Sequence, residues 1–453
     1  MHRADPRISG STHPEPISVD EFNDAMRALG PFPDDAVFVC AVSGGGDSMA
    51  LCHFLNLWIG KNQKLYAVTV DHGLRPESTA EARQVNQWLC EKNIAHHILT
   101  WDGQKPDRNI QHHARAARYD LLTKFCTDRS NAFLCTAHHQ DDQIETFLSR
   151  LCRGSGVYGL SGMSARQIHN GTVILRPFLQ FEKSRLSAAL TNARQNWIED
   201  PSNNNDRFTR VKLRQLRGTF ADLGLDARRL LRTIDRMQSA RSVIERQVDS
   251  CAAESVHWSQ FGFCQIDGAL WAKYDQEIAM RVLGECLASI GGGDYTPRYD
   301  SLYELYIGLC GGEILTRTLG GCIIESDGAV ITIMREHAAI AAATDITAQL
   351  VWDGRFEIRA DGTPDATDCF IAPLGIDGWR DIVQSRPDLR DIRMPVHAKY
   401  ALPAIKMHCA GVDETLAAPH LNYWKDQKIQ NNWSALSINF RPRHHKDAFG
   451  LPI

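Results

Sequence analysis

Three consecutive glycines, flanked by hydroxyl and carboxyl side chains, form the most distinctive chemical pattern in this chain. The segment consists of Ser43, Gly44, Gly45, Gly46, Asp47 and Ser48. It lies between an apolar run at 36–42 and a helical pattern at 48–59. Glycine permits positive φ angles and a close approach to a ligand, and free N–H groups at a helix start attract anions. The segment therefore predicts a phosphate-binding loop with Asp47 as a magnesium ligand, and a glycine-rich turn without a ligand is the alternative.

Acidic and imidazole side chains follow two of the expected strands. Asp71 and His72 come directly after the apolar run 65–70. The group after the apolar run 132–136 consists of His138, Asp141, Asp142 and Glu145. Spacings of three and four residues at a helix start bring carboxylates together, and like charges so close need a cation. A magnesium ion and the ammonium groups of an amino acid both fit, and a capped surface helix is the third interpretation.

Arginines recur where an anionic substrate would need them. Arg115 and Arg118 share a face of an expected helix, and Arg153 lies in a glycine-rich loop that is able to fold over a substrate. Two further groups of basic residues follow in the sequence. The first consists of Arg207, Arg210, Lys212, Arg214 and Arg217, and the second consists of Arg228, Arg232 and Arg236, at intervals of four. Both groups suit a phosphate backbone, and a solvated basic helix face is the alternative.

Alternating strand and helix patterns predict how these side chains are positioned. From residue 36 onward the alternation indicates a parallel sheet covered by helices on both faces, with ligands at the carboxyl ends of its strands. We therefore expect an α/β fold with a parallel-sheet nucleotide-binding domain at 36–217. Residues 1–35 are expected to form an N-terminal extension with one short helix, which Ser18 and Glu21 open as a capping box.

The rest of the chain has weaker patterns. Residues 218–335 read as a mostly helical, RNA-binding domain, and residues 345–453 read as a small mixed α/β domain of short strand-like pieces. The net charge of −4 requires a nucleic acid to be held by local basic patches rather than by the field of the whole protein. The thirteen cysteines include no C-x-x-C pair, so neither a disulfide framework nor a zinc site is expected.

Nothing in the sequence indicates a membrane. No apolar run approaches the roughly 20 residues that span a bilayer, and residues 1–17 lack the order of a secretory signal. We expect a cytoplasmic protein, and a homodimer is compatible with the sequence.

The motifs resemble a known family. The loop has neither the G-K-[ST] ending of a Walker loop nor the G-x-G-x-x-G pattern of a dinucleotide site. It resembles the S-G-G-x-D-S loop of the PP-loop ATP pyrophosphatases, which grip the pyrophosphate part of ATP. The segments Asp71–Arg75 and His138–Thr146 resemble the D-H-G-L-R and H-x-x-D-D-x-x-E-T signatures of the tRNA(Ile)-lysidine synthetase family, and strong resemblance covers residues 36–217.

That resemblance implies a substrate and a reaction. The family's wobble cytidine, in the CAU anticodon of isoleucine tRNA, attacks the α-phosphate of ATP through its C2 oxygen. The ε-amine of free lysine then displaces AMP, so the implied cofactors are ATP and Mg²⁺. Asp47, His138, Asp141, Asp142 and Glu145 are the catalytic candidates, and the base and the lysine ligand among them stay open. The loop residues with Asp71 and His72 would hold ATP. The substrate-binding candidates are Arg115, Arg118, Arg153, Arg207, Arg210 and Arg214.

Three other functions compete with this one. A PP-loop tRNA thiolase would activate a base in the same way, although such enzymes usually carry paired cysteines. An amidotransferase-type synthetase would need a glutaminase domain or an ammonia source, and residues 1–35 are too short for one. A non-catalytic RNA-binding protein would have no need of the carboxylates at 47, 141, 142 and 145.

Overall fold

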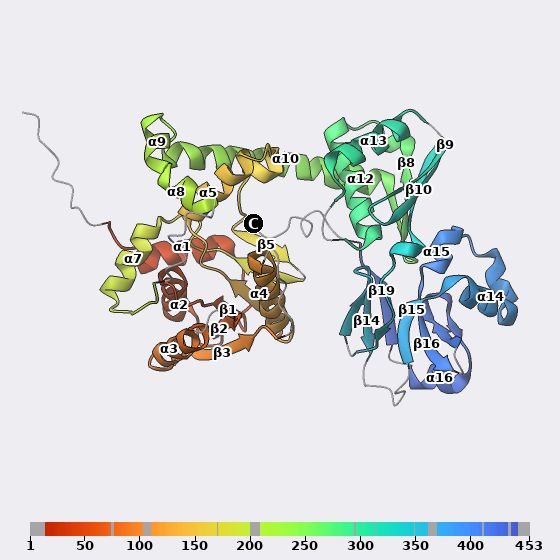
Figure 1. Ribbon diagram of the computed structural model, residues 1–453, viewed down its shortest axis with the longest axis horizontal. Helices are drawn as coiled ribbons and strands as arrows, with labels where there is room; N and C mark the ends of the chain where they lie inside the picture. Colours follow the sequence, from red (N-terminus) through yellow and green to blue (C-terminus); the bar gives the residue numbers. More distant parts are fainter. Residues whose placement is uncertain are drawn as a thin grey trace, which may run out of the picture. The chain divides into compact units, whose positions relative to one another are not determined.

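The computed structural model describes most of the chain, which it divides into two compact units. The described residues are 14–73, 77–102, 110–169, 171–199, 209–293, 296–312, 314–347, 349–360, 369–409, 412–433 and 436–442. One unit ends at Arg241, and the other begins at Ser242 (Figure 1). The N-terminal unit therefore includes residues 218–241, which follow the boundary expected at residue 217.

A six-stranded sheet forms the centre of the N-terminal unit, in the order β3-β2-β1-β4-β6-β5. Its strands are β1 (Val37–Ala41), β2 (Lys64–Asp71), β3 (Ala95–Thr100), β4 (Ala132–Cys135), β5 (Arg166–His169) and β6 (Thr172–Leu175). All neighbours pair in parallel except β5, which is antiparallel to β6. The strand order reverses between β1 and β4, and the carboxyl ends of two such strands open a crevice for a ligand.

Helices cover both faces of this sheet, as the alternation of strand and helix patterns predicted. Phe38 and Cys40 of β1 face a core formed with α1 (Val19–Leu29), α2 (Gly46–Trp58), α3 (Ser78–Cys90) and α7 (Lys183–Asn192). Val37 and Val39 face the opposite core, which α4 (Ile110–Thr127) covers. This arrangement confirms the α/β fold class. The Ser18–Glu21 capping box opens α1, and α1 packs into the core of the unit.

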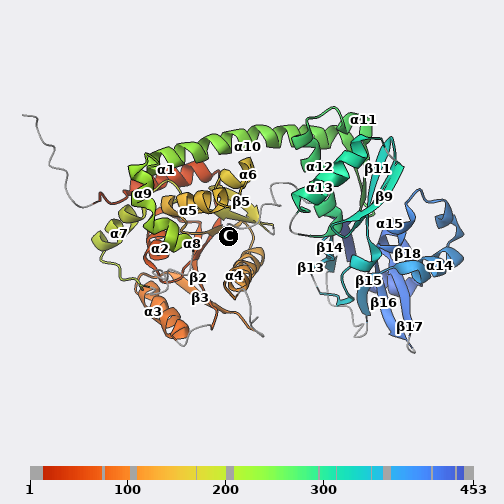
Figure 2. The ribbon, with the colours of Figure 1, turned by 45° about the horizontal axis from the view of Figure 1, so that its top comes forward.

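A separate helical cluster continues the N-terminal unit. Its members are α5 (Gln140–Leu151), α6 (Val157–Leu160), α8 (Thr209–Gln215), α9 (Arg217–Asp222) and the first part of α10 (Ala227–Ser255). Ile144 and Phe147 of α5 pack with Leu213 of α8 and with Leu230 and Ile234 of α10. Figure 2 shows α10 as one long helix. The buried cluster ties the helices that carry the basic residues to the helix that carries Asp141 and Asp142.

The second unit begins with a region that is less helical than its sequence suggested. Its helices are α11 (Gly268–Trp271), α12 (Gln276–Gly291) and α13 (Tyr299–Cys310). They pack on a five-stranded sheet of β7 (Val256–Ser259), β8 (Phe263–Asp267), β11 (Val330–Arg335), β10 (Cys322–Asp327) and β9 (Ile314–Leu319), whose neighbours pair antiparallel. These strands have four to six residues each. Neighbours in sequence pair in β7–β8 and in β9–β10–β11, whereas β8 pairs with β11 from beyond α11, α12 and α13.

The remaining part of the second unit is mixed α/β. One sheet contains β12 (Thr344–Asp345), β15 (Cys369–Pro373), β16 (Pro403–Cys409), β17 (Val412–Ala418) and β18 (Tyr423–Trp424). The other contains β13 (Gln349–Trp352), β14 (Phe356–Ala360) and β19 (Leu436–Phe440). The helices are α14 (Gly375–Ser385), α15 (Val396–Tyr400) and α16 (Gln427–Asn432), with 3-10 turns at His337–Ala339, Pro387–Asp391 and Pro419–Leu421.

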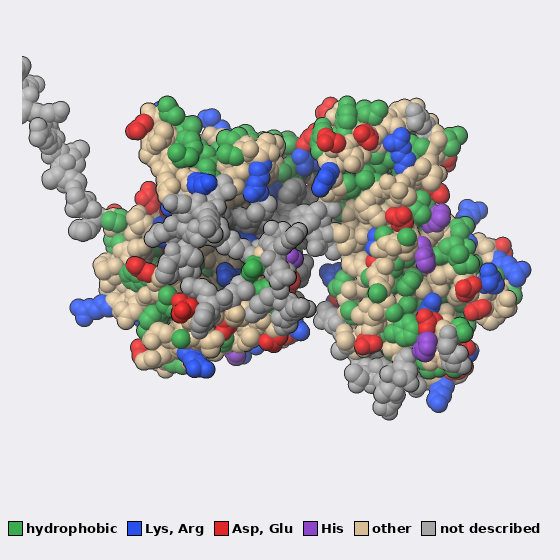
Figure 3. Space-filling model, in the orientation of Figure 1, with side chains coloured by type: hydrophobic (Ala, Val, Ile, Leu, Met, Phe, Trp, Pro, Cys, Tyr) green, Lys and Arg blue, Asp and Glu red, His purple; other side chains and the backbone are tan. Residues whose placement is uncertain are grey.

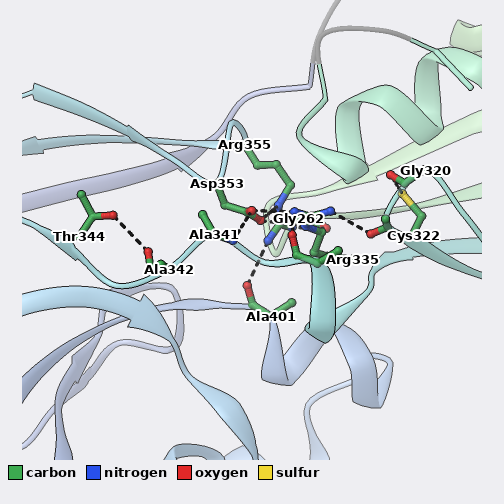
Figure 4. A network of polar contacts seen from close by, with 12 residues as sticks. Gly262, Gly320, Cys322, Arg335, Ala341, Ala342, Thr344, Asp353, Arg355 and Ala401 are labelled. Carbon is green, nitrogen blue, oxygen red and sulfur yellow. Dashed lines mark hydrogen bonds and ion pairs between the residues drawn. The ribbon is translucent and has the colours of Figure 1, made fainter. Parts of the chain in front are cut away.

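A buried ion network joins the segments of the second unit (Figure 4). Asp353 Oδ1 accepts from Arg335 Nη2 at 2.8 Å, and its Oδ2 accepts from Arg335 Nε at 3.0 Å and Arg355 Nε at 2.7 Å. Arg355 also donates to the carbonyls of Gly262 and Ala401, both at 3.3 Å. The three charged side chains are at most 7% exposed. One carboxylate thus pairs with two buried guanidinium groups that reach distant parts of the unit.

All thirteen cysteines are free thiols. Within the part of the chain that the structure describes, none of the helices combines the length and the apolar character that a membrane span requires.

Candidate active site

The glycine-rich segment forms the connection between β1 and α2. Gly45 caps α2, and the hydroxyl of Ser48 donates to the Gly45 carbonyl at 2.9 Å and accepts from the backbone N–H of Ser43 at 3.2 Å. Gly44 has a φ angle of +85°, and a Cβ there would lie 2.8 Å from the side chains of both Ile198 and Val85. Only glycine therefore fits this position without strain. Ser48 is buried and braces the loop, whereas Ser43 is exposed.

Five polar residues from three helix starts meet beside this loop. His139 Nε2 lies 3.5 Å from Asp47 Oδ2 and 3.5 Å from Asp142 Oδ2, and its Nδ1 lies 3.7 Å from Asp141 Oδ2. Lys183 Nζ lies 3.1 Å from Asp47 Oδ2, and the Lys183 backbone N–H donates to Asp141 Oδ2 at 3.1 Å. Since α2 follows β1 and α5 follows β4, this group lies at the crevice where the strand order reverses.

The electrostatics of the group favour ion pairs. Burial would lower the pKa of His139, but the contact with Asp47 and the charges of Asp142, Asp47 and Asp141 raise that pKa above its ordinary value. Burial would likewise raise the pKa of Asp47, yet His139 and Lys183 lower it below its ordinary value. The protein therefore keeps Asp47 ionised and favours the imidazolium form of His139, which lies only 3% exposed.

Glu145 lies one helical turn further along α5 and has a cationic partner from α8. Its Oε1 accepts from Arg214 Nε at 2.9 Å and lies 2.8 Å from Arg214 Nη2. The Glu145 side chain is 3% exposed, and that of Arg214 is 43% exposed. Glu145 was expected beside Asp141 and Asp142 in one acidic group, and Arg214 at the RNA. The structure instead joins these two residues in a pair that links α5 and α8.

Asp71, at the end of β2, organises the turn that follows it. Its Oδ1 accepts from the Gly73 N–H at 2.9 Å and from Ser78 Oγ at 2.8 Å, and its Oδ2 accepts from Thr79 Oγ1 at 2.7 Å. Burial would raise the pKa of Asp71, but these hydrogen bonds lower it. The side-chain hydrogen bonds of Asp71 thus join the end of β2 to the start of α3.

The neighbouring basic residues lie together on α4. Arg118 donates from Nε to His72 Nε2 at 3.2 Å, and Arg115 lies over the ring of Tyr119 at 5.3 Å from its centre. Desolvation and the nearby charge of Arg115 lower the pKa of Arg118. Nε and Nη2 of Arg115 are buried without a hydrogen-bond partner. Two cations so close together, one with unused donors, favour an anionic ligand.

The other predicted residues occupy different positions. His138 follows β4 and lies 2.9 Å from Thr136 through its Nδ1. Arg153 is exposed just after α5. Arg207 lies outside the described residues, and of Arg210 only its place in α8 is described.

Two residues of this group were missed in the sequence. His139 was overlooked because its neighbour His138 begins the recognised motif, although His139 is the residue that caps α5. Lys183 lies 42 positions after Asp141 and stands in no recognised motif.

The carboxylates suit a metal ion that arrives with its substrate. Among the described residues, no group of three or more His, Cys, Asp or Glu side chains has by itself the geometry of a metal site. Mg²⁺ is commonly held by one or two carboxylates together with substrate phosphates and water. Asp47 lies beside the phosphate loop and is 27% exposed, so its carboxylate is accessible for such a site.

The fold and this site define a PP-loop nucleotide-binding protein, and the family model described as the PP-loop domain matches residues 18–217. The tRNA(Ile)-lysidine synthase of Ruegeria pomeroyi is 35% identical over 396 residues, which cover 87% of this chain and 90% of that protein. The enzyme of the same name from Wolbachia pipientis wMel is 34% identical, covering 86% and 91%. That of Rickettsia akari is 30% identical, covering 89% and 93%. This chain belongs to the tRNA(Ile)-lysidine synthase family, which confirms the resemblance inferred from its motifs.

Proposed function

We propose that this protein is a tRNA(Ile)-lysidine synthase, a ligase that forms a carbon–nitrogen bond between free lysine and C2 of the wobble cytidine of isoleucine tRNA. ATP would first adenylate the cytidine with release of pyrophosphate, and lysine would then displace AMP. The observation that carries the proposal is the group of Asp47, His139 and Asp141 beside the glycine loop, in a chain whose relatives share this name over most of their length.

The loop and the start of α2 would bind the triphosphate. Backbone N–H groups at Gly45 and Gly46 open the helix, and Ser43 is exposed beside them. Asp47 would hold Mg²⁺, which when bound neutralises phosphate charge. His139 fixes the direction of the Asp47 carboxylate through the 3.5 Å contact.

A carboxylate is also needed to recognise the lysine ammonium groups and to accept a proton from the attacking amine. Asp141 and Asp142 flank His139 and are 15% and 25% exposed, so they are open to a small ligand. Glu145 is almost completely buried against Arg214. We therefore propose that Asp141, with Asp142, recognises lysine, and that Glu145 positions α8 against α5.

This assignment predicts that the two steps separate in variants. In Asp141→Asn the KM for lysine should rise roughly ten-fold or more, the effect of losing one charge-assisted hydrogen bond, while adenylation survives. Adenylation is followed as lysine-independent pyrophosphate release from ATP and tRNA. Glu145→Gln is the matched control on the same helix and should leave the KM for lysine unchanged. Equal loss of both steps in Asp141→Asn would contradict a role in lysine recognition.

The tRNA would be held by the basic residues of α8 and α10. Arg228, Arg232 and Arg236 are exposed, whereas Leu230 and Ile234 of the same helix are buried in the core. On the face drawn in Figure 3, acidic and basic side chains of the described residues are interspersed over each unit. A local stripe, rather than the whole surface, would therefore attract the RNA. Arg115 and Arg118 offer a second place where an anionic group of the substrate would bind, close to His72.

A salt series tests the stripe. Replacing Arg228, Arg232 and Arg236 with glutamine should weaken tRNA binding at least ten-fold and flatten the slope of log K against log salt by about two to three. The control Arg27→Gln removes an exposed arginine that is paired with Asp24 in α1. If the triple variant has the same slope as the control, the stripe is solvated surface.

The function itself is tested by assaying AMP release with ATP, lysine and single purified tRNAs. We expect release that depends on lysine and on isoleucine tRNA with a CAU anticodon. Release that requires a sulfur donor instead would support the thiolase alternative, and no release with any tRNA would support a non-catalytic protein. A homodimer and a cytoplasmic location stay predictions.

A further inference from the structure

Lys183 contacts two acidic residues of the site, although no motif of the sequence includes it. It is the first residue of α7, after the N-cap Glu182. Its ammonium lies 3.1 Å from Asp47 Oδ2, and its backbone N–H donates to Asp141 Oδ2 at 3.1 Å. The backbone bond holds the Cα atom beside the site, so the side chain can move without moving the helix.

The Lys183 ammonium lies against the carboxylate of Asp47, where the proposed function places Mg²⁺. Lys183 Nζ contacts the Asp47 oxygen that also faces His139, and this carboxylate is the one that the proposed function assigns to Mg²⁺. The Lys183 side chain is 48% exposed, and a half-exposed pair between lysine and aspartate is weak and easily exchanged. A lysine carries a compact charge on a flexible four-carbon stem, which suits it to move between two anionic partners.

We infer that Lys183 is a phosphate-binding residue that neutralises Asp47 until the nucleotide arrives. With ATP bound, Asp47 would hold the magnesium ion, and the Lys183 ammonium would donate to a phosphate oxygen of ATP instead of to Asp47. This inference rests on the proposed function, since it assigns a second partner to Lys183 only if ATP occupies the loop. No bond is made or broken in the exchange.

Binding measurements on the intact protein test the exchange. Lys183→Met should bind ATP in the presence of Mg²⁺ about ten- to a hundred-fold more weakly by calorimetry, the range for one charge-assisted hydrogen bond. Lys183→Arg keeps the charge and should lose at most about five-fold. Without nucleotide, Lys183→Met should bind Mn²⁺ several-fold more tightly in paramagnetic resonance titrations, because Asp47 no longer has a competing cation.

A matched control is Lys425→Met, which removes a lysine of similar exposure paired with Glu414 in the other unit. It should change neither the ATP nor the Mn²⁺ affinity. Wild-type ATP affinity in Lys183→Met would overturn the inference, and so would weaker ATP binding without tighter Mn²⁺ binding. Lys183→Gln, which keeps a polar side chain, provides the same comparison should the methionine variant lose its native circular dichroism. Failure of the wild-type protein to bind ATP would instead refute the proposed function.

Discussion

Asp47→Ala should reduce lysine incorporation at least a thousand-fold while leaving the fold and the tRNA affinity close to those of the wild type. The carboxylate lies at the start of α2 beside the phosphate loop, where the proposed function assigns it the metal. Its side chain is 27% exposed, so the substitution opens no cavity in the core. His139 would lose one of the contacts that raise its pKa and would keep Asp141 and Asp142 as anionic neighbours, so the substitution leaves no unpaired buried charge.

The measurement combines tRNA-dependent AMP release at saturating Mg²⁺ with circular dichroism and a tRNA binding isotherm. Asp24→Ala serves as the control, because Asp24 is an exposed carboxylate of α1 in the same unit. Substantial activity of Asp47→Ala at high Mg²⁺ would remove Asp47 from the mechanism. Loss of tRNA binding together with activity would show that the substitution acts on the fold.

Asp353→Asn should destabilise the C-terminal unit by about 3–5 kcal/mol, the usual cost of removing one partner from a buried ion pair. Asp353 is the shared partner of Arg335 and Arg355, which are both buried. The other donors of these two arginines reach the carbonyls of Gly321, Gly262 and Ala401. An amide of the same shape would keep some hydrogen bonds but leave two guanidinium charges without a counterion. Native-state hydrogen exchange in β11 and β14 would report the local loss, since a chain with two units has no single unfolding transition.

The exposed pair of Arg386 and Asp388 provides the comparison. Asp388→Asn should leave the stability close to that of the wild type, because both side chains of this pair are exposed to solvent. A difference of less than about 1 kcal/mol between Asp353→Asn and Asp388→Asn would show that the buried network contributes specificity rather than stability.

The sequence alone determined the chemistry of the phosphate loop and the type of sheet that carries it. Glycine at 44 is required by a positive φ angle and by the side chains packed against it, so the residue type itself reveals the local structure. The apolar runs of β1, β2 and β4 are buried on both faces, which makes parallel strands recognisable from short stretches of sequence. The sequence pattern of a helix that begins just after an apolar strand likewise placed Asp141 and Asp142 together in one first helical turn.

Tertiary structure decided which of these residues meet. His139, rather than His138, contacts Asp47, because capping of α5 turns that ring toward α2, and no local pattern distinguishes two adjacent histidines. Lys183 reaches Asp47 across 136 positions of sequence, and Glu145 pairs with Arg214 across 69. Strand β8 likewise pairs with β11, which lies beyond α11, α12 and α13 in the sequence. The local periodicity of a sequence indicates the conformation of each segment. The ion pairs between segments, and the partner that each strand takes, depend instead on packing in three dimensions, which a single sequence does not show.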